Sequence, residues 1–328
     1  SRDNNIKTTI DIRLQQYVQE IFTEKGGAVI IMDTDTGEVL SATSFPSFDN
    51  NIFVSGISHK KWDELKNDFN HPFTNKIVNG HYPPGSVWKM GVAMSFLENN
   101  IPKGYQVNDT GSFPLGKRNF RCWKHKGHGK VNLRKAIEQS CNIYFYDLAF
   151  KLGITKISTM MERFGFGERT GLDIHEESKG IMPSVAWKRA RYNKSWYTGE
   201  TLSVGIGQSY WTVTPLQLTQ ALTTLVNRGE RKIPHLLKAN SELIIESSGN
   251  AYHQITPTIY EPQAPLKLKN DEHWNVVLDA MHSTVQTVGA TAHAAFKGAK
   301  YDASGKTGSA QVARRKQGEK YDAKTTSE

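Results

Sequence analysis

Three short motifs carry side chains that could form and break a covalent bond. Along the chain they are Ser86-Val87-Trp88-Lys89, then Ser140-Cys141-Asn142, then Lys306-Thr307-Gly308. Each motif alone is short enough to arise by chance among ordinary helix and strand residues. Because all three occur in this order, each with a suitable local pattern, the sequence favours a joint catalytic role.

The first motif pairs a nucleophile with a base. A serine hydroxyl is a poor nucleophile until a base removes its proton. Ser86 and Lys89 are three residues apart at the start of a predicted helix, so both side chains share one helix face. The lysine amine must be neutral to act as base, which requires burial or a nearby positive charge to lower its pKa. A helix start also offers N–H groups to an oxyanion.

The other two motifs supply the remaining groups for serine acyl transfer. Ser140 offers a hydroxyl that can relay a proton to a leaving amine, and Asn142 offers an amide to the substrate backbone and to the catalytic lysine. Lys306 and Thr307 can bind a carboxylate at the substrate terminus. Gly308 lets a peptide approach the strand edge without a side chain in the way. The three motifs therefore predict one acyl-transfer site.

Four residues of metal-binding type lie in or near the second motif. Asp109, Cys122, His128 and Cys141 lie within one loop and one helix of each other, and these ligand types suit tetrahedral zinc. The segment 117–135 holds eight Lys or Arg and no acid, which favours thiolates. A zinc ion here would brace the wall of the active site.

Other interpretations of the two cysteines stay open. The spacing matches no standard zinc-finger pattern, and His125 could replace His128. Cys122 and Cys141 could instead form a disulfide, or Cys141 could be a small buried hydrophobe.

The N-terminal region predicts a helix followed by a hairpin. Apolar residues recur at helical spacing over 8–23, and Gly26-Gly27 ends that helix. A buried strand over 28–32, a turn over 33–37 and a returning strand over 38–43 follow.

The rest of the chain is predicted to be mostly helical. The patterns indicate helices over 86–98, over 133–152 with a kink near Ser140, and over 272–288. The segment 110–129 is predicted to be a basic loop, and a strand is predicted within 301–312.

Thr214-Pro215 is a good start for a further helix, which Asn227 to Gly229 would end. That helix is expected to turn one apolar face to the core: Leu218, Leu222, Leu225 and Val226. With a hairpin first, helices between and a strand last, the sequence predicts one α/β domain over 1–328, without repeats or a linker. Its sheet would be assembled from both ends of the chain.

Composition narrows the class of protein. Hydrophobic residues at 38% and charged residues at 22% indicate an ordinary globular chain. No apolar run approaches the ~20 residues of a membrane helix, and residues 1–7 do not resemble a signal peptide. We therefore expect any membrane anchor to lie outside this sequence. The formal charge of +9 favours either solubility or an anionic partner. No nucleic-acid-binding pattern is present, so nucleic acid is not expected.

The motif set resembles that of penicillin-binding proteins and serine β-lactamases. The chain is similar to the elongation-type class B penicillin-binding proteins of Gram-negative bacteria over nearly its whole length. The stretches that carry this similarity are Thr9-Ile10-Asp11, Tyr82-Pro83-Pro84-Gly85-Ser86, 123–129, 205–208 and 214–218.

The resemblance implies a fold and an activity. The fold would be the penicillin-binding/serine β-lactamase-like transpeptidase fold, a central antiparallel sheet flanked by helices with a mostly helical subdomain. The activity would be DD-transpeptidation, which cross-links peptidoglycan in cell elongation and rod-shape maintenance. Ser86 would attack a stem peptide ending in D-Ala-D-Ala, and an amine of a neighbouring stem would resolve the acyl-enzyme. The N–H groups of Ser86 and Ser309 would form the oxyanion hole.

The resemblance also implies surroundings and partners. We expect two more strands and a helix after the Lys306 strand, so that 1–328 would be a transpeptidase domain truncated at its C-terminus. A membrane helix and a pedestal domain would precede it, which places the domain in the periplasm on an inner-membrane anchor, although this chain alone would be soluble. Expected partners are lipid-linked precursors and stem peptides, β-lactams as covalent inhibitors, and a membrane glycosyltransferase of the elongation machinery.

No cofactor is required for this chemistry, although a structural Zn²⁺ is compatible with it. Relatives often have an acidic residue at the position of Cys122. Replacement of a carboxylate ligand by a thiolate ligand at the same metal site would explain this difference.

Two rival functions share the three motifs. A serine β-lactamase needs a water-activating base, for which Glu176, Glu177 and Glu200 are candidates outside any recognisable hydrolase loop. A non-catalytic penicillin sensor would be acylated but would turn over no stem peptide.

Overall fold

The computed structural model describes residues 7–24, 26–54, 56–238 and 263–310, and these residues form two compact units. Unit 1 comprises Ser1–His81, Glu168–Lys179 and Thr214–Leu266; unit 2 comprises Tyr82–Gly167, Gly180–Val213 and Lys267–Glu328. Each unit is built from three separate stretches of chain, which explains why the sequence shows no linker.

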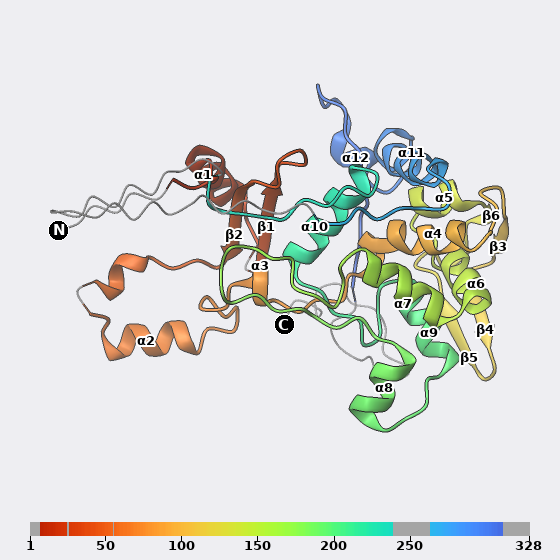
Figure 1. The fold of residues 1–328 in the computed structure, drawn as a ribbon, viewed down its shortest axis with the longest axis horizontal. Helices are drawn as coiled ribbons and strands as arrows, with labels where there is room; N and C mark the ends of the chain where they lie inside the picture. The colour runs from red at the N-terminus through yellow and green to blue at the C-terminus, as the bar shows by residue number, and fades with distance from the viewer. Residues whose placement is uncertain (1–6, 25, 55, 239–262, 311–328) are drawn as a thin grey trace. The chain divides into compact units, whose positions relative to one another are not determined.

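The hairpin of unit 1 forms as the sequence predicts (Figure 1). Strands β1 (Gly27–Met32) and β2 (Val39–Phe45) pair antiparallel, with Gly27 opposite Phe45 and a register shift after Ile31. Helix α1 (Ile12–Ile21) packs against β2. It is shorter than predicted because the Asp11 side chain accepts the N–H groups of Arg13 and Leu14 and so caps the helix there. Strand β1 is half-buried rather than fully buried.

Three helices and one short turn complete the described part of unit 1. These are η1 (Asn50–Phe53), α2 (His59–Lys66), α3 (Lys76–Asn79) and α10 (Pro215–Val226). Helices α3 and α10 pack against the hairpin. They close a core made of Val39, Ile77, Val78, Leu172 and Leu216.

The predicted buried face of α10 is only partly correct. Leu225 is buried as predicted, but Leu222 is 38% exposed. Leu216 and Gln220, which are not part of the predicted face, are buried. The reason lies in hydrogen bonds, because the Gln220 amide donates to the carbonyls of Thr170 and Lys232, which draws a polar side chain inward. The start of the helix is as predicted, with Thr214 and Gln217 forming a capping box.

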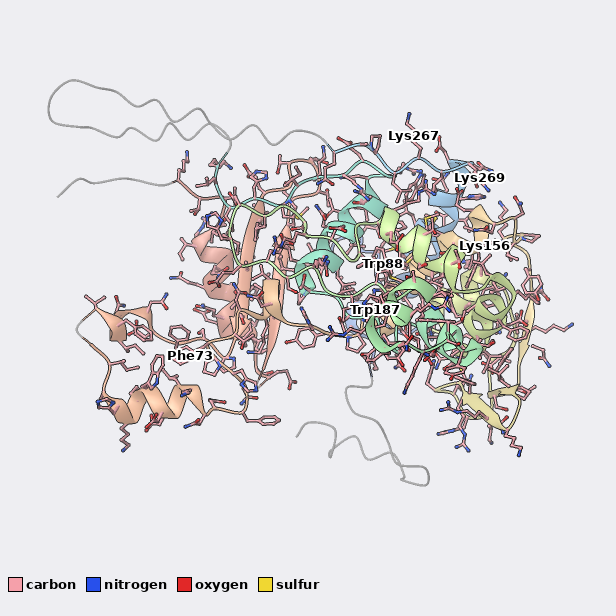
Figure 2. All side chains as sticks on the ribbon, turned by 60° about the horizontal axis from the view of Figure 1, so that its bottom comes forward. Phe73, Trp88, Lys156, Trp187, Lys267 and Lys269 are labelled. Carbon is pink, nitrogen blue, oxygen red and sulfur yellow. The ribbon has the colours of Figure 1, made fainter. Side chains whose placement is uncertain are left out.

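A fully buried helix lies at the centre of unit 2. The 3₁₀ turn η2 (Gly85–Trp88) leads into α4 (Lys89–Glu98), and every residue of α4 is buried. Burial on all sides is typical of a central helix. Around it lie α5 (Leu133–Glu138), α6 (Asn142–Leu152), α7 (Ile154–Arg163) and α11 (Glu272–Gln286). The Trp88 ring, labelled in Figure 2, contacts Phe164 and Phe166, which follow α7.

Two small β-ribbons in unit 2 correct the prediction of a loop over 110–129. Strand β3 (Val107–Asp109) pairs with β6 (Gly129–Val131), and β4 (Ser112–Leu115) pairs with β5 (Arg118–Arg121). Their charged, short strands lack the apolar alternation by which a strand is recognised. The helices α8 (Val185–Tyr192), α9 (Thr198–Gly205) and α12 (His293–Phe296) complete the described part of the unit.

The strand predicted within 301–312 is absent from residues 301–310. These residues pair with no strand in the described chain, and residues 311–312 lie outside it. A strand forms only where a neighbouring strand supplies ladder hydrogen bonds. Across the described ranges, no helix has both the length and the apolar character to cross a membrane.

Candidate active site

The first motif forms a tight turn at the entry to the central helix of unit 2. Ser86 lies in η2 and is partly exposed, while Lys89 opens α4 and is fully buried. The Lys89 N–H donates to the Ser86 carbonyl, which closes the turn. Gly85 has φ of +55°, a conformation that favours glycine, so the chain bends sharply just before the serine.

The Lys89 amine connects the first motif to the second. Its Nζ donates to Asn142 Oδ1 at 2.7 Å, to the Ser140 carbonyl at 2.9 Å and to Ser140 Oγ at 3.4 Å. Within the described chain, none of its hydrogen bonds leads to Ser86 Oγ. Burial lowers the pKa of Lys89 to about 7, and the charge of Lys306 contributes to this shift. A neutral amine, as a general base requires, is therefore accessible near neutral pH.

The second motif occupies a sharp corner between α5 and α6. Ser140 has φ of +51°, which is uncommon for a residue with a side chain and explains the predicted kink. The Asn142 amide also donates to the Arg121 carbonyl at 3.2 Å. Because both ends of this amide are engaged, its orientation is fixed.

The third motif is anchored to α11 by its backbone. The Gly305 N–H donates to the Met281 carbonyl at 3.2 Å. The Lys306 amine donates to the Thr307 carbonyl at 2.7 Å, and burial lowers the pKa of Lys306 to about 7.

Two glycines bring the third motif against the first. A Cβ on Gly308 would overlap Val87, the residue after the predicted nucleophile. A Cβ on Gly85 would lie 2.8 Å from the Ser309 carbonyl oxygen. Since Lys89 bonds to the Ser140–Asn142 corner, the structure gathers all three motifs in one part of unit 2. The sequence-predicted residues are thus neighbours, including Ser309.

The four candidate metal ligands also converge. Asp109, Cys122, His128 and Cys141 are all buried, and their ligand atoms lie within 4.8 Å of one another. His128 Nδ1 is 2.6 Å from an Asp109 carboxylate oxygen, and the Cys141 thiol donates to the same oxygen at 3.2 Å. A buried set of one carboxylate, one imidazole and two thiols could hold a metal ion. His125 is exposed and does not belong to this group.

The electrostatics of this cluster favour deprotonation of Asp109 and Cys122, whereas the hydrogen bond with Cys122 and burial raise the pKa of the Cys141 thiol. Burial opposes ionisation of Asp109, but hydrogen bonds from His128, Gly111 and Cys141 outweigh it and hold the pKa of the carboxyl below its usual range. A hydrogen bond from Cys141 lowers the pKa of Cys122. Both thiols are free, so the structure contains no disulfide between them.

The cluster is joined directly to the second motif. The Cys122 sulfur accepts the Asn142 N–H at 3.4 Å, and Cys141 caps α6 by accepting the Tyr144 N–H. A metal at this position would therefore stiffen the corner that carries Ser140 and Asn142.

Sequence reasoning missed two residues beside the motifs. Thr291 Oγ1 lies 2.7 Å from Thr307 Oγ1. Trp123 is 54% exposed, and its indole donates to the Gln139 carbonyl, next to Ser140. Neither belongs to one of the three motifs, and only the fold brings them here; the available signal for Trp123 is its place in the 123–129 stretch that carries the family similarity.

Two of the three glutamates proposed for a β-lactamase, Glu177 and Glu200, are engaged by neighbouring groups. The Glu200 carboxylate pairs with Lys188 at 2.5 and 2.7 Å. Glu176 and Glu177 belong to unit 1, and Glu177 accepts the N–H groups of Thr170 and Gly171. Neither Glu177 nor Glu200 is free to activate a water molecule in this arrangement.

Comparison with known proteins places this geometry in a family. The family model for the penicillin binding protein transpeptidase domain matches residues 27–327. The peptidoglycan D,D-transpeptidase MrdA of Escherichia coli K12 is 39% identical over 98% of this chain and 50% of its own length. The chain thus spans about half the length of the curated relatives it matches.

Solved structures agree with this assignment. PBP2 of Pseudomonas aeruginosa, in complex with WCK 5153, is 37% identical, with a TM-score of 0.85 over 94% of this chain and 66% of that one. PBP2 of Helicobacter pylori, in a complex with MreC, is 35% identical, with a TM-score of 0.84 over 94% of this chain and 55% of that one. The chain therefore belongs to the penicillin-binding protein transpeptidase domain family.

Proposed function

We propose that this chain is the transpeptidase domain of an elongation-type peptidoglycan D,D-transpeptidase, with Ser86 as its nucleophile. The observation that carries the proposal is the meeting of the motifs: the Lys89 amine bonds to the Ser140–Asn142 corner, and Gly308 packs against Val87. Kinship with MrdA proteins supports the same activity.

Acylation would proceed in three steps. Neutral Lys89 accepts the Ser86 hydroxyl proton as Oγ attacks the carbonyl carbon of the penultimate D-Ala. The N–H groups of Ser86 and Ser309 stabilise the resulting oxyanion. The tetrahedral intermediate then collapses, the C–N bond breaks, and Ser140 relays the proton to the departing D-Ala amine. In deacylation, an amine from a second stem peptide attacks the ester carbonyl, an amide C–N bond forms as the bond to Ser86 Oγ breaks, and the amine proton passes through Lys89 back to Ser86 Oγ.

The remaining groups would orient the substrate. Protonated Lys306 and the Thr307 hydroxyl bind the terminal carboxylate, and the Asn142 amide contacts the peptide backbone. Gly308 leaves room for the extended peptide beside the 306–309 segment. A β-lactam carries a carboxylate and a strained amide, so it would acylate Ser86 as a mimic of the same terminus.

Intact mass after incubation with benzylpenicillin tests the nucleophile. We expect one adduct per chain on the native protein and none on Ser86→Ala. Ser95→Ala is a matched control, because Ser95 is a buried serine of α4 whose hydroxyl has no partner in the described chain. We expect it to be acylated like the native protein. An adduct on Ser86→Ala would refute the assignment.

Two further measurements separate the rival functions. A chromogenic cephalosporin should give one burst and no sustained hydrolysis, since sustained turnover would indicate a β-lactamase. Release of D-Ala from a stem-peptide substrate, or of the thiol from a thioester substrate, should accompany acylation, since its absence would indicate a penicillin sensor.

The proposed setting is the periplasmic face of the inner membrane. The relatives are about twice as long as the matched region. In a full-length protein of that kind, segments outside 1–328 would supply a membrane anchor and the remaining strands of the antiparallel sheet. Lipid-linked precursors would be substrates, and a membrane glycosyltransferase would be a partner. The MreC complex of the Helicobacter pylori relative supports a place in an assembly of this kind.

We also propose that Asp109, Cys122, His128 and Cys141 bind one structural zinc ion. The donor set and its burial support zinc over the harder cations, which prefer oxygen ligands. Bound zinc would supply rigidity to the Ser140–Asn142 corner and no step of the acyl transfer.

Elemental analysis of the purified chain tests the zinc proposal. We expect about one zinc ion per chain in the native protein and its loss in His128→Ala. His125→Ala is the matched control, because His125 lies in the same segment but is exposed, and it should retain zinc. A native chain without zinc, or equal loss in both variants, would exclude this ligand set.

A further inference from the structure

We infer that Thr291 is a positioning residue that orients the Thr307 hydroxyl and thereby tunes recognition of the substrate carboxylate. Thr291 lies in the turn after α11, outside all three motifs. The inference rests on the proposed function, in which Thr307 contacts that carboxylate.

Thr291 links the second motif to the third. Its backbone N–H and its Oγ1 both donate to the Glu138 carbonyl, at 3.1 and 3.2 Å. Glu138 is the last residue of α5, two positions before Ser140. The Thr307 hydroxyl donates to Thr291 Oγ1 at 2.7 Å.

A second bond strengthens this link, since the Gln139 amide donates to the Gly289 carbonyl at 3.0 Å. The turn after α11 is therefore attached to the end of α5 at two points. From this attached turn, Thr291 holds the side chain of Thr307.

The hydrogen bonds fix the direction of each hydroxyl. Thr291 Oγ1 has one proton, and the Glu138 carbonyl can only accept it. Thr291 must then accept the proton of Thr307, so the Thr307 Oγ1 lies in one rotamer with its proton engaged. A carboxylate also accepts only, so its binding requires the Thr307 proton to turn toward it.

The backbone N–H of Thr291 keeps the free-energy cost of turning these two hydroxyl groups low. When Thr307 donates to a carboxylate, the Thr291 hydroxyl can turn and donate to Thr307. The Glu138 carbonyl keeps the N–H of Thr291, so no buried acceptor is left without a partner. The reversed chain also polarises the Thr307 hydroxyl toward the anion. Without the Thr291 hydroxyl, Thr307 would lose both its fixed rotamer and this support.

The test compares two acylating probes, benzylpenicillin and its methyl ester, which lacks the carboxylate charge. The measured quantity is the carboxylate preference, the ratio of the two acylation rate constants obtained by intact mass over time. Thr291→Val keeps the shape but removes the hydroxyl, and we expect the preference to fall by about fivefold. Thr291→Ser keeps the hydroxyl and should stay within about twofold of native.

A matched control comes from the preceding helix. Thr284 is buried in α11, and its hydroxyl donates to the Ala280 carbonyl of the same helix rather than to Thr307 or Thr291. Thr284→Val should leave the preference within about twofold of native, even if it lowers stability. If Thr291→Val does not fold, Thr291→Ala compared with Thr291→Ser isolates the hydroxyl in the same way.

The outcomes separate the two proposals. Equal slowing of both probes by Thr291→Val, or a preference within about twofold of native, overturns the role of Thr291 and leaves acyl transfer intact. Failure of the native chain to form an adduct on Ser86 overturns the proposed function and this inference together. A selective loss for benzylpenicillin, restored in Thr291→Ser, supports the inference.

Discussion

Two buried amines dominate the chemistry at the scale of single residues. Burial brings the pKa values of Lys89 and Lys306 to about 7, far below that of a lysine in water. Their proposed tasks require opposite states, since Lys89 must be neutral to accept a proton and Lys306 must be charged to attract a carboxylate. The charge of one also disfavours the charge of the other, as the effect of Lys306 on Lys89 indicates.

The pH dependence of acylation follows from these two values. As pH rises through about 7, the neutral fraction of Lys89 increases and the charged fraction of Lys306 decreases. Benzylpenicillin needs both states, so its acylation rate should pass through a maximum near pH 7. The methyl ester needs only neutral Lys89, so its rate should rise with pH and reach a plateau.

The measurement is the acylation rate constant for each probe from about pH 5 to about pH 9. Lys89→Arg is the control, because a guanidinium does not lose its proton in this range, and acylation should be abolished at every pH. Identical profiles for the two probes would contradict the role given to Lys306.

At the scale of elements, backbone contacts at glycines set how closely the segments approach the nucleophile. The Gly85 N–H donates to the Gly207 carbonyl at 2.8 Å, which joins the end of α9 to the turn before Ser86. Gly207 has φ of +75°, and a Cβ there would overlap the backbone of Gly85. The position therefore excludes a side chain on two grounds, conformation and space.

Gly207→Ala should lower both stability and acylation. The left-handed conformation and the overlap together should reduce the free energy of unfolding by roughly 2–4 kcal/mol. Displacement of Gly85 should slow acylation of Ser86 by about tenfold or more. Chemical denaturation and intact-mass kinetics measure the two effects.

Gly116→Ala separates strain from overlap. Gly116 has φ of +57° but nothing within 4 Å of its Cβ position, so only the conformational cost of about 1 kcal/mol applies. This variant should retain the native acylation rate. If the two variants lost equal stability, the contact between Gly207 and Gly85 would have no energetic importance.

At the scale of the whole molecule, the sequence predicts chemistry better than architecture. Ser86 and Lys89 are recognisable because their roles depend on local spacing, and the hairpin is recognisable because its turn residues and apolar runs are adjacent. The buried face of α10 is not predictable in this way, since it depends on carbonyl groups that distant segments present to Gln220.

Contacts between distant segments also limit what the sequence predicts around the candidate site. Thr291 has no sequence signal because its importance comes from a bond across sixteen positions to Thr307. The sequence does not predict the β3–β6 and β4–β5 ribbons, because their strands are short and charged. Pairing between strands, rather than their own residues, decides that they form.

The discontinuous make-up of unit 1 has a consequence for its biogenesis. Its core joins Val39 of the hairpin to Leu172 and to Leu216 of α10, so the first of these residues leaves the ribosome long before the last. Until Leu172 and Leu216 have been synthesised, part of the apolar surface of the hairpin stays exposed to water, and exposed apolar surface binds chaperones. Completion of unit 1 is thus a late event in synthesis, and a nascent chain released before Leu216 lacks one member of that core.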